Sequence, residues 1–208
     1  QRLEPKIDIW YQQRYRYWVY ANIPSKRTMI DVGANVGIFA RPSADHFERV
    51  ICFEPVPQNF AALELNMAQC ANATLHPLGL SDREQRVQFQ VQINKCGCSY
   101  QVDVITSDAG FYNVECELRT MDSFSIESVD WIKIDVEGYE LEVIAGLVGI
   151  STRHVLLEVS PRRYPHTSEA ALVAALSGVL GCQMERVWTN RSEEASEVYD
   201  ALFTCVGK

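Results

Sequence analysis

The sequence lacks the features of a membrane protein and of a protein that binds duplex nucleic acid. It contains no run of about 18 consecutive apolar residues, the length that a membrane-spanning helix needs, and no signal-peptide core near its N-terminus. Its 27 Asp and Glu residues outnumber its 19 Lys and Arg residues, and the net charge of −8 excludes a broad basic surface. We therefore expect a cytoplasmic protein that acts on a small molecule and has neither a membrane nor duplex nucleic acid as its partner.

The cysteines lack the paired Cys-x-x-Cys spacing that makes a zinc site convincing. There are seven of them, an odd number, scattered along the chain. Cys96 and Cys98 are the only close pair, and we interpret them as small residues in a hairpin. All seven are expected to be reduced thiols, and the sequence assigns no metal site.

Apolar runs that alternate with helix-like segments predict an α/β fold, in a chain whose 208 residues are near the size of one large domain. Such alternation gives a mostly parallel sheet with helices on both faces. Two further runs, near 183–190 and 199–206, are joined by a short polar loop and must form an antiparallel hairpin, because a parallel return needs a longer crossover. The other apolar runs cover residues 28–33, 49–55, 73–80, 131–138 and 154–160.

Two segments differ from this pattern. Residues 85–121 contain stretches of polar and apolar alternation, such as QRVQFQVQI, which predict inserted antiparallel strands with one solvated face. Residues 1–27 contain the aromatic stretch WYQQRYRYWVY, which we interpret as a helix docked on the core or as a lid. Because no linker or internal repeat separates these segments, residues 1–208 are expected to form a single domain.

The stretch DVGANVG follows the first predicted strand, at a place where open α/β sheets bind ligands. Gly33 and Gly37 allow a tight turn and a close approach of the backbone to a ligand, with Asn35 between them. The spacing does not match the GxGxxG pattern, which disfavours an NAD-dependent oxidoreductase. Asp31, just before the first glycine, also suits a cationic ligand better than a pyrophosphate.

Two more acidic residues follow the next predicted strands. Glu54 lies 21 residues after Gly33, where a carboxylate can accept hydrogen bonds from both ribose hydroxyls of an adenosine. Asp82 ends the third run, where it can accept an adenine amino proton or simply cap a turn.

The segment WIKIDVEGYE places several charges in an apolar run. On a strand, Lys133, Asp135 and Glu137 would share one face, with neighbours roughly 6–7 Å apart. We interpret Lys133 as a buried counter-ion of Asp135 or of Asp31. Asp135 and Glu137 are candidate general bases. A second interpretation is a Mg²⁺ ion held by Asp135 and Glu158.

The chain resembles the FkbM family of S-adenosylmethionine-dependent methyltransferases in six motifs that keep the family's order: DVGANVGIF, FEPVPQNF, LHPLGLSDRE, RTMDSF, WIKIDVEGYELEVIAGL and HVLLEVS. The resemblance extends from about Thr28 to Ser160. It implies a Rossmann-like class I methyltransferase fold, with a mostly parallel seven-stranded sheet, an antiparallel last strand and helices on both faces. It also implies O-methylation of a hydroxyl on a saccharide or a small natural product.

The resemblance assigns roles to the candidate residues. Asp135 and Glu137 would face the sulfonium and the acceptor, and Lys133 would assist the transfer by moderating the pKa of the carboxylate that acts as the base. An alternative function is a catalytically silent adenosine-binding partner subunit. The residues implied to bind S-adenosylmethionine are Asp31, Gly33, Asn35, Gly37, Glu54 and Asp82.

Overall fold

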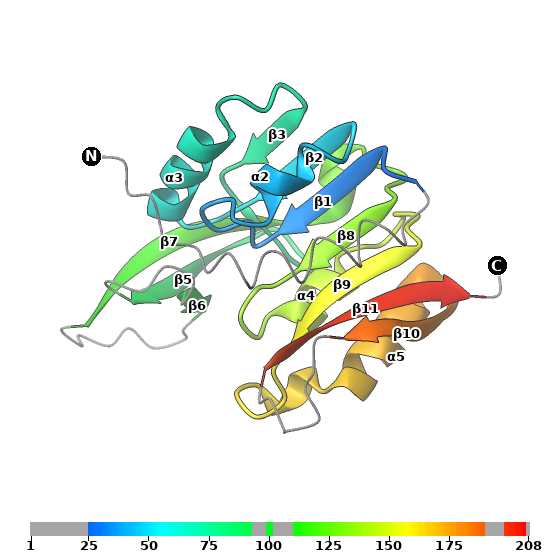
Figure 1. Ribbon diagram of the computed structural model, residues 1–208. Coiled ribbons are helices and arrows are strands. Elements are labelled where there is room, and N and C mark those ends of the chain that lie inside the picture. Colours follow the sequence, from blue (N-terminus) through cyan, green and yellow to red (C-terminus); the bar gives the residue numbers. More distant parts are fainter. Residues whose placement is uncertain (1–24, 93–98, 102–109, 190–197, 207–208) are drawn as a thin grey trace.

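The computed structural model describes residues 25–92, 99–101, 110–189 and 198–206 (Figure 1). All candidate site residues named above lie within these ranges. The aromatic stretch of the N-terminal segment and the Cys96–Cys98 pair lie outside the described residues, so the predicted lid and hairpin stay predictions. The prediction that 1–208 form one domain also stays a prediction.

A seven-stranded sheet forms the centre of the molecule, and its strands are β1 (Thr28–Val32), β2 (Arg49–Phe53), β3 (Ala73–His76), β8 (Trp131–Ile134), β9 (His154–Val159), β10 (Gln183–Thr189) and β11 (Tyr199–Val206). Their order across the sheet is β10-β11-β9-β8-β1-β2-β3 (Figure 1). The last strand, β11, is antiparallel to both β9 and β10, and the other pairings are parallel. The predicted sheet, including its antiparallel last strand, is confirmed.

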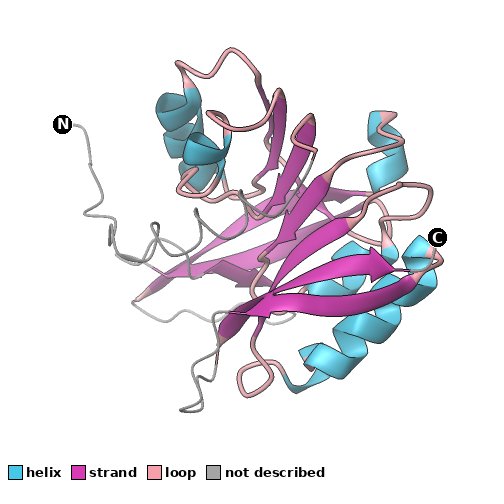
Figure 2. Ribbon diagram, turned by 45° about the vertical axis from the view of Figure 1, so that its right-hand side comes forward, coloured by secondary structure: helices cyan, strands magenta, loops and turns pink. Residues whose placement is uncertain are grey.

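The helical elements are α2 (Ala40–Ser43), α3 (Pro57–Met67), α4 (Glu140–Ala145), α5 (Glu169–Leu180) and the short 3₁₀ helices η1 (Met121–Phe124) and η2 (Pro165–Thr167). Helices α2 and α3 lie over one face of the sheet, and α4 and α5 lie over the other (Figure 2). The predicted cover of helices on both faces is confirmed. Within the described ranges, no helix combines the length and the apolar character needed to cross a membrane.

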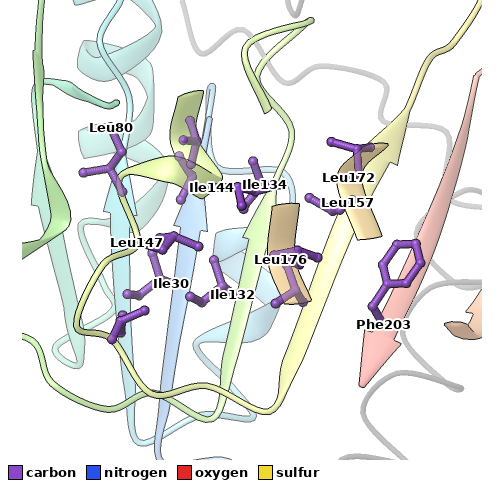
Figure 3. Close-up of a cluster of buried hydrophobic side chains, with 14 of the residues drawn as sticks. Ile30, Leu80, Ile132, Ile134, Ile144, Leu147, Leu157, Leu172, Leu176 and Phe203 are labelled. Carbon is purple, nitrogen blue, oxygen red and sulfur yellow. The ribbon is translucent and has the colours of Figure 1, made fainter. Parts of the chain in front are cut away.

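Alternate side chains of β1 and β8 fill the two cores. Ile30 and Ile132 are fully buried on the side of α4 and α5, as Figure 3 shows. Met29 and Trp131 are fully buried in the other cluster, with residues of α2 and α3. Because successive strand residues alternate between faces, Asp31 on β1 lies on the α2 and α3 side.

A second, four-stranded sheet is built from β4 (Gly79–Leu80), β5 (Gln85–Gln92), β6 (Ser99–Gln101) and β7 (Phe111–Arg119). Strand β5 pairs antiparallel with β6 and β7, and β4 pairs parallel with β7. The prediction of one continuous strand over 73–80 is wrong, since β3 and β4 belong to different sheets. Pro77 lies between them and has no N–H group with which to continue the ladder.

One cysteine pair contradicts the prediction of reduced thiols. A disulfide joins Cys182 to Cys205, because the β10–β11 hairpin brings their Cα atoms to 5.9 Å. Among the described residues, Cys52, Cys70 and Cys116 are free thiols. The cytoplasm, where thiols are usually kept reduced, stays a prediction for the location of this protein.

Candidate active site

The carboxyl ends of β1 and β8 mark the point at which the order of the strands reverses. From β1 the sheet continues to β2 and β3 on one side and to β8 and β9 on the other. Ligands of open α/β sheets bind at such a point. Most of the candidate residues lie in or next to the chain segments that leave these two strands, whereas Glu54 follows β2 and Asp82 follows β4.

Lys133 joins β1 and β8 through a buried ion pair. It lies opposite Asp31 in the strand register, and its Nζ atom is 3.1 Å from Asp31 Oδ1 and 3.3 Å from Asp135 Oδ2. Burial lowers the pKa of Lys133, but the charges of Asp135 and Asp31 raise it by more, so the ammonium group stays protonated. Burial raises the pKa of Asp31, against the opposing effect of Lys133. The predicted counter-ion role of Lys133 is confirmed, and its role in transfer stays a prediction.

The loop after β1 turns through three residues with positive φ angles, Gly33 at 76°, Asn35 at 52° and Gly37 at 88°. A Cβ atom at Gly33 would collide with the carbonyl oxygen of Asp135, so the loops after β1 and β8 touch at this glycine. The predicted tight turn is therefore present, and it depends on residues that tolerate the left-handed region.

Glu54, after β2, is buried and holds the loop after β1. Its Oε2 atom accepts a hydrogen bond from the backbone N–H of Asn35 at 2.8 Å, and its Oε1 atom accepts one from Val56 at 2.9 Å. Burial raises the pKa of Glu54, while the hydrogen bonds from Val56, Asn35 and Asn59 lower it. Each carboxylate oxygen has two lone pairs, so Glu54 keeps acceptor capacity for a ligand hydroxyl.

Asp82 lies in a polar cluster that the sequence did not reveal. Ser81 donates from its hydroxyl to Asp82 Oδ1 at 3.0 Å, and the amide of Gln85 donates to Ser81 Oγ at 3.2 Å and to the Tyr139 hydroxyl at 2.9 Å. Tyr139 comes from the segment just before α4, far along the chain from the other three residues. No sequence signal connects it with Asp82.

The loop after β8 departs from the predicted strand geometry. Strand β8 ends at Ile134, so Asp135 and Glu137 lie beyond it and do not share a strand face with Lys133 as predicted. Glu137 has a φ angle of 55°, and Gly138 has one of 100°. The buried carboxylate of Glu140 holds this turn, because its Oε1 atom accepts the backbone N–H of Gly138 at 3.1 Å.

Glu137 is covered by the loop after β9. Its Oε2 atom is 2.5 Å from Arg163 Nη1 and 3.5 Å from the Tyr164 hydroxyl. The pKa of Glu137 is raised to about 7, mainly by burial; Arg163 opposes this rise, and the negative charges of Asp135 and Glu140 add to it. A carboxylate with such a pKa can accept a proton near neutral pH.

Glu158, near the end of β9, is the third carboxyl group at this edge of the sheet. Its Oε1 atom accepts a hydrogen bond from the Ser160 hydroxyl at 2.5 Å. Burial, and next the charge of Asp135, raise the pKa of Glu158 to about 8. No group of three or more His, Cys, Asp and Glu residues in the described parts of the chain is arranged to hold a metal ion. The Mg²⁺ interpretation therefore gains no support.

Arg163 and Tyr164 also belong to the site; the sequence did not single out Tyr164, and it did not pair Arg163 with Glu137. Both come from the loop between β9 and α5, and the Tyr164 ring packs where a Cβ atom of Gly138 would lie. His166, in the same loop, is 2.9 Å from the carbonyl oxygen of Gly138 through Nε2. A signal was present in the paired arginines of PRRYPH, but nothing in the sequence paired them with Glu137.

The model of the methyltransferase FkbM domain matches residues 31–177. The chain belongs to this family. The match includes all the candidate residues, from Asp31 to Glu158. The FkbM resemblance drawn from the six motifs is confirmed.

Curated relatives of this FkbM-family chain include named methyltransferases and one much larger protein, of which the chain matches only a small part. It is 30% identical over 141 residues to the 2-O-methyltransferase NoeI of Sinorhizobium fredii, covering 57% of this chain and 56% of NoeI. It is 25% identical to methyltransferase sdnD of Sordaria araneosa, covering 61% of this chain and 62% of sdnD. It is 27% identical to the AMB antimetabolite synthetase AmbE of Pseudomonas aeruginosa, covering 82% of this chain and 10% of AmbE. The chain thus spans less than two thirds of each relative.

Solved structures show the same fold at low identity. Methyltransferase FkbM from Methylobacillus flagellatus superposes with a TM-score of 0.58 at 16% identity, covering 86% of this chain and 43% of that one. The N-methyltransferase NodS from Bradyrhizobium japonicum, solved with S-adenosyl-L-homocysteine, gives a TM-score of 0.51 at 12% identity, covering 88% of this chain and 80% of that one. These likenesses establish a class I methyltransferase fold for this FkbM-family chain.

Proposed function

We propose that the chain is an S-adenosylmethionine-dependent methyltransferase that methylates a hydroxyl oxygen of a saccharide or a small natural product. The observation that carries this proposal is the placement of Glu54 and Glu137 at the carboxyl ends of β2 and β8, on opposite sides of β1. Glu54 has acceptor capacity for ribose hydroxyls, and Glu137 has a pKa of about 7 that suits a general base.

The residues around β1 fit the cofactor's chemistry. Glu54 would accept hydrogen bonds from the ribose hydroxyls, and Asp82 would accept one from the adenine amino group. The backbone of Gly33, Asn35 and Gly37 would face the methionine end. Asp31 Oδ2 is buried with no hydrogen-bond partner among the described residues, and it offers an acceptor near that cationic end.

The protein's own residues would orient the acceptor and take its proton. Bound S-adenosylmethionine would supply a methyl group whose bond to sulfur breaks, with the electron pair left on sulfur, as the acceptor oxygen bonds to carbon. Glu137 would take the hydroxyl proton in that step. Lys133, whose Nζ atom is 3.3 Å from Asp135 Oδ2, would hold that carboxylate in place. Orientation in a fixed site is a large part of such a rate enhancement.

Oxygen is the proposed methyl acceptor because a hydroxyl has to lose its proton as it attacks, and the site offers carboxyl groups with raised pKa values for this purpose. The relative NoeI is named as a 2-O-methyltransferase, which agrees with this choice. A catalytically silent adenosine-binding subunit would also hold the cofactor, but it would transfer no methyl group.

Cofactor binding is tested by thermal shift with S-adenosylmethionine, S-adenosylhomocysteine and NAD. We expect the first two to stabilise the protein, and Glu54→Gln to weaken that stabilisation. Stabilisation by NAD alone would reject the proposal. A screen of hydroxyl acceptors with methyl-labelled cofactor then separates an enzyme from a silent subunit, because only the enzyme labels an acceptor.

A further inference from the structure

The carboxylate proposed as the base is masked by a cation. Arg163 Nη1 lies 2.5 Å from Glu137 Oε2, and the side chain of Glu137 is 17% exposed while that of Arg163 is 40% exposed. The guanidinium carbon of Arg163 also lies 5.1 Å from the centre of the Tyr164 ring. Arg163 is therefore the outer partner of the pair, and it covers Glu137 toward solvent.

This pairing opposes the proposed role of Glu137. An ion pair stabilises the charged carboxylate and so makes it a weaker proton acceptor. The charged and titratable groups that interact with Glu137 are Arg163 and Tyr164 from the loop after β9, Glu158 from β9, Asp135 from the loop after β8, and Glu140 from α4. Among these groups, only Arg163 is a cation. Departure of Arg163 would leave Glu137 among acidic groups and raise its basicity.

A bound anion would draw Arg163 away from Glu137. The guanidinium group presents a planar fork of N–H donors, which matches the two oxygens of a carboxylate better than the donors of other side chains do. Separation of Arg163 from Glu137 is costly unless a second carboxylate binds Arg163, because an ion pair that loses one partner leaves a charge unpaired. The exposure of Arg163 gives such a group access from solvent.

We propose that Arg163 selects hydroxyl acceptors that carry a carboxylate, and that its movement from Glu137 to this carboxylate frees Glu137 to take the hydroxyl proton. This inference rests on the proposed methyltransferase function. It makes Arg163 a specificity-determining residue, and it makes arrival of the correct acceptor the event that unmasks the base.

The position of Arg163 assigns it to the acceptor and not to the cofactor. The residues proposed to bind the cofactor follow β1, β2 and β4, whereas Arg163 follows β9, on the other side of β8 in the sheet. The carboxylate of the cofactor's methionine part is the competing source of an anion. The two sources can be distinguished by kinetics. Only if Arg163 binds a carboxylate of the acceptor should the effect of an Arg163 substitution on kcat/KM differ between an acid and its ester.

The test compares sugar acids and hydroxy acids with their methyl esters as acceptors, using methyl-labelled cofactor. The variants are Arg163→Gln and Arg163→Lys, and the matched control is Arg186→Gln. Arg186 also pairs with a glutamate, Glu169 at 2.7 Å, and is 41% exposed, but it lies on β10. Cofactor affinity and melting temperature are measured for every variant.

We expect the wild type and Arg186→Gln to prefer the acid over its ester by about 10- to 100-fold in kcat/KM, as for a charge-assisted hydrogen bond. Arg163→Gln should lose this preference while it keeps its cofactor affinity. Arg163→Lys should retain part of it, because an ammonium keeps the charge but not the fork. With the acid as acceptor, the pH at which kcat is half-maximal should lie above the pH at which kcat/KM is half-maximal. The parameter kcat reports the complex, in which Arg163 has left Glu137, whereas kcat/KM reports the free enzyme, in which the two are paired.

Three results would overturn the inference. Turnover of acids and esters with equal kcat/KM by the wild type would reject acceptor selection while leaving the methyltransferase function intact. An equal loss of cofactor affinity in Arg163→Gln with either acceptor would assign Arg163 to the cofactor. Labelling of no acceptor at all, despite cofactor binding, would reject the proposed function and this inference with it.

Discussion

Lys133 on β8 lies directly opposite Asp31 on β1, and its Nζ atom is 3.1 Å from Asp31 Oδ1 and 3.3 Å from Asp135 Oδ2. One ammonium group therefore serves two carboxylates at the centre of the sheet. Asp31 is fully buried and Lys133 is 8% exposed, so solvent screens this pair little.

Removal of Lys133 alone should destabilise the protein strongly. Lys133→Met leaves Asp31 buried without its counter-ion, and we expect a loss of about 3–5 kcal/mol in the free energy of unfolding. The double variant Lys133→Met, Asp31→Asn removes both charges and should recover much of this loss. Urea unfolding measures both. A single variant as stable as the wild type would show that the pair contributes nothing.

Gly33→Ala should cost more stability than Gly149→Ala. Both glycines have positive φ angles, 76° and 85°, so alanine carries the same type of backbone strain at each, about 1–2 kcal/mol. A Cβ atom would meet the carbonyl oxygen of Asp135 at Gly33, whereas nothing lies within 4 Å at Gly149. Urea unfolding should show only the backbone penalty at Gly149 and a clearly larger loss at Gly33. Equal losses would mean that the two loops separate freely.

Glu137→Gln should abolish most of the methyl transfer without changing cofactor affinity. Loss of a general base typically lowers the rate by about 10²–10⁴-fold. In the wild type kcat/KM should rise with pH through about 7, the pKa of Glu137 in the free enzyme, because the base acts in its deprotonated form. Glu169→Gln is the matched control, since Glu169 also pairs with an arginine but lies on α5. An unchanged rate in Glu137→Gln would remove this residue from the mechanism.

Stability should fall as the pH rises from 5 to 8, because the pKa of Glu158 is raised from 4.5 in the unfolded chain to about 8 in the folded one. Between these values the folded state binds more protons than the unfolded state, so increasing pH favours unfolding. The slope from one such group is at most about 1.4 kcal/mol per pH unit. Urea unfolding at several pH values should give a shallower slope for Glu158→Gln. Glu115 is an exposed residue on β7, so Glu115→Gln should keep the wild-type slope. Identical slopes in all three proteins would contradict the raised pKa of Glu158.

The sheet was predictable because hydrophobic patterns report burial directly. Apolar runs between helix-like segments predicted a parallel sheet, and the short polar link before Tyr199 required an antiparallel last strand. The break between β3 and β4 was missed because the run 73–80 stays apolar across Pro77 while the chain changes sheets. The Cys182–Cys205 disulfide was missed because pairing depends on strand register, which cysteine spacing does not reveal.

The site was predictable only in part. The opposing positions of Asp31 and Lys133 follow from strand parity, so their ion pair was within reach of the sequence. The pairing of Glu137 with Arg163 was not, because it joins two loops whose paths are set by tertiary packing. Strand parity even misled at Glu137, since β8 ends at Ile134 and the chain turns through a positive φ angle.

The contact between Gly33 and the carbonyl oxygen of Asp135 bears on the sequence of binding events. The loop that would receive the cofactor rests directly on the loop that carries the proposed base, because Gly33 has no side chain at its contact with the carbonyl oxygen of Asp135. Seating of the cofactor would therefore set the position of Asp135 and of Glu137 beyond it before an acceptor can use them. In steady-state kinetics this mechanical link predicts a compulsory order, with the cofactor binding first and its demethylated product leaving last.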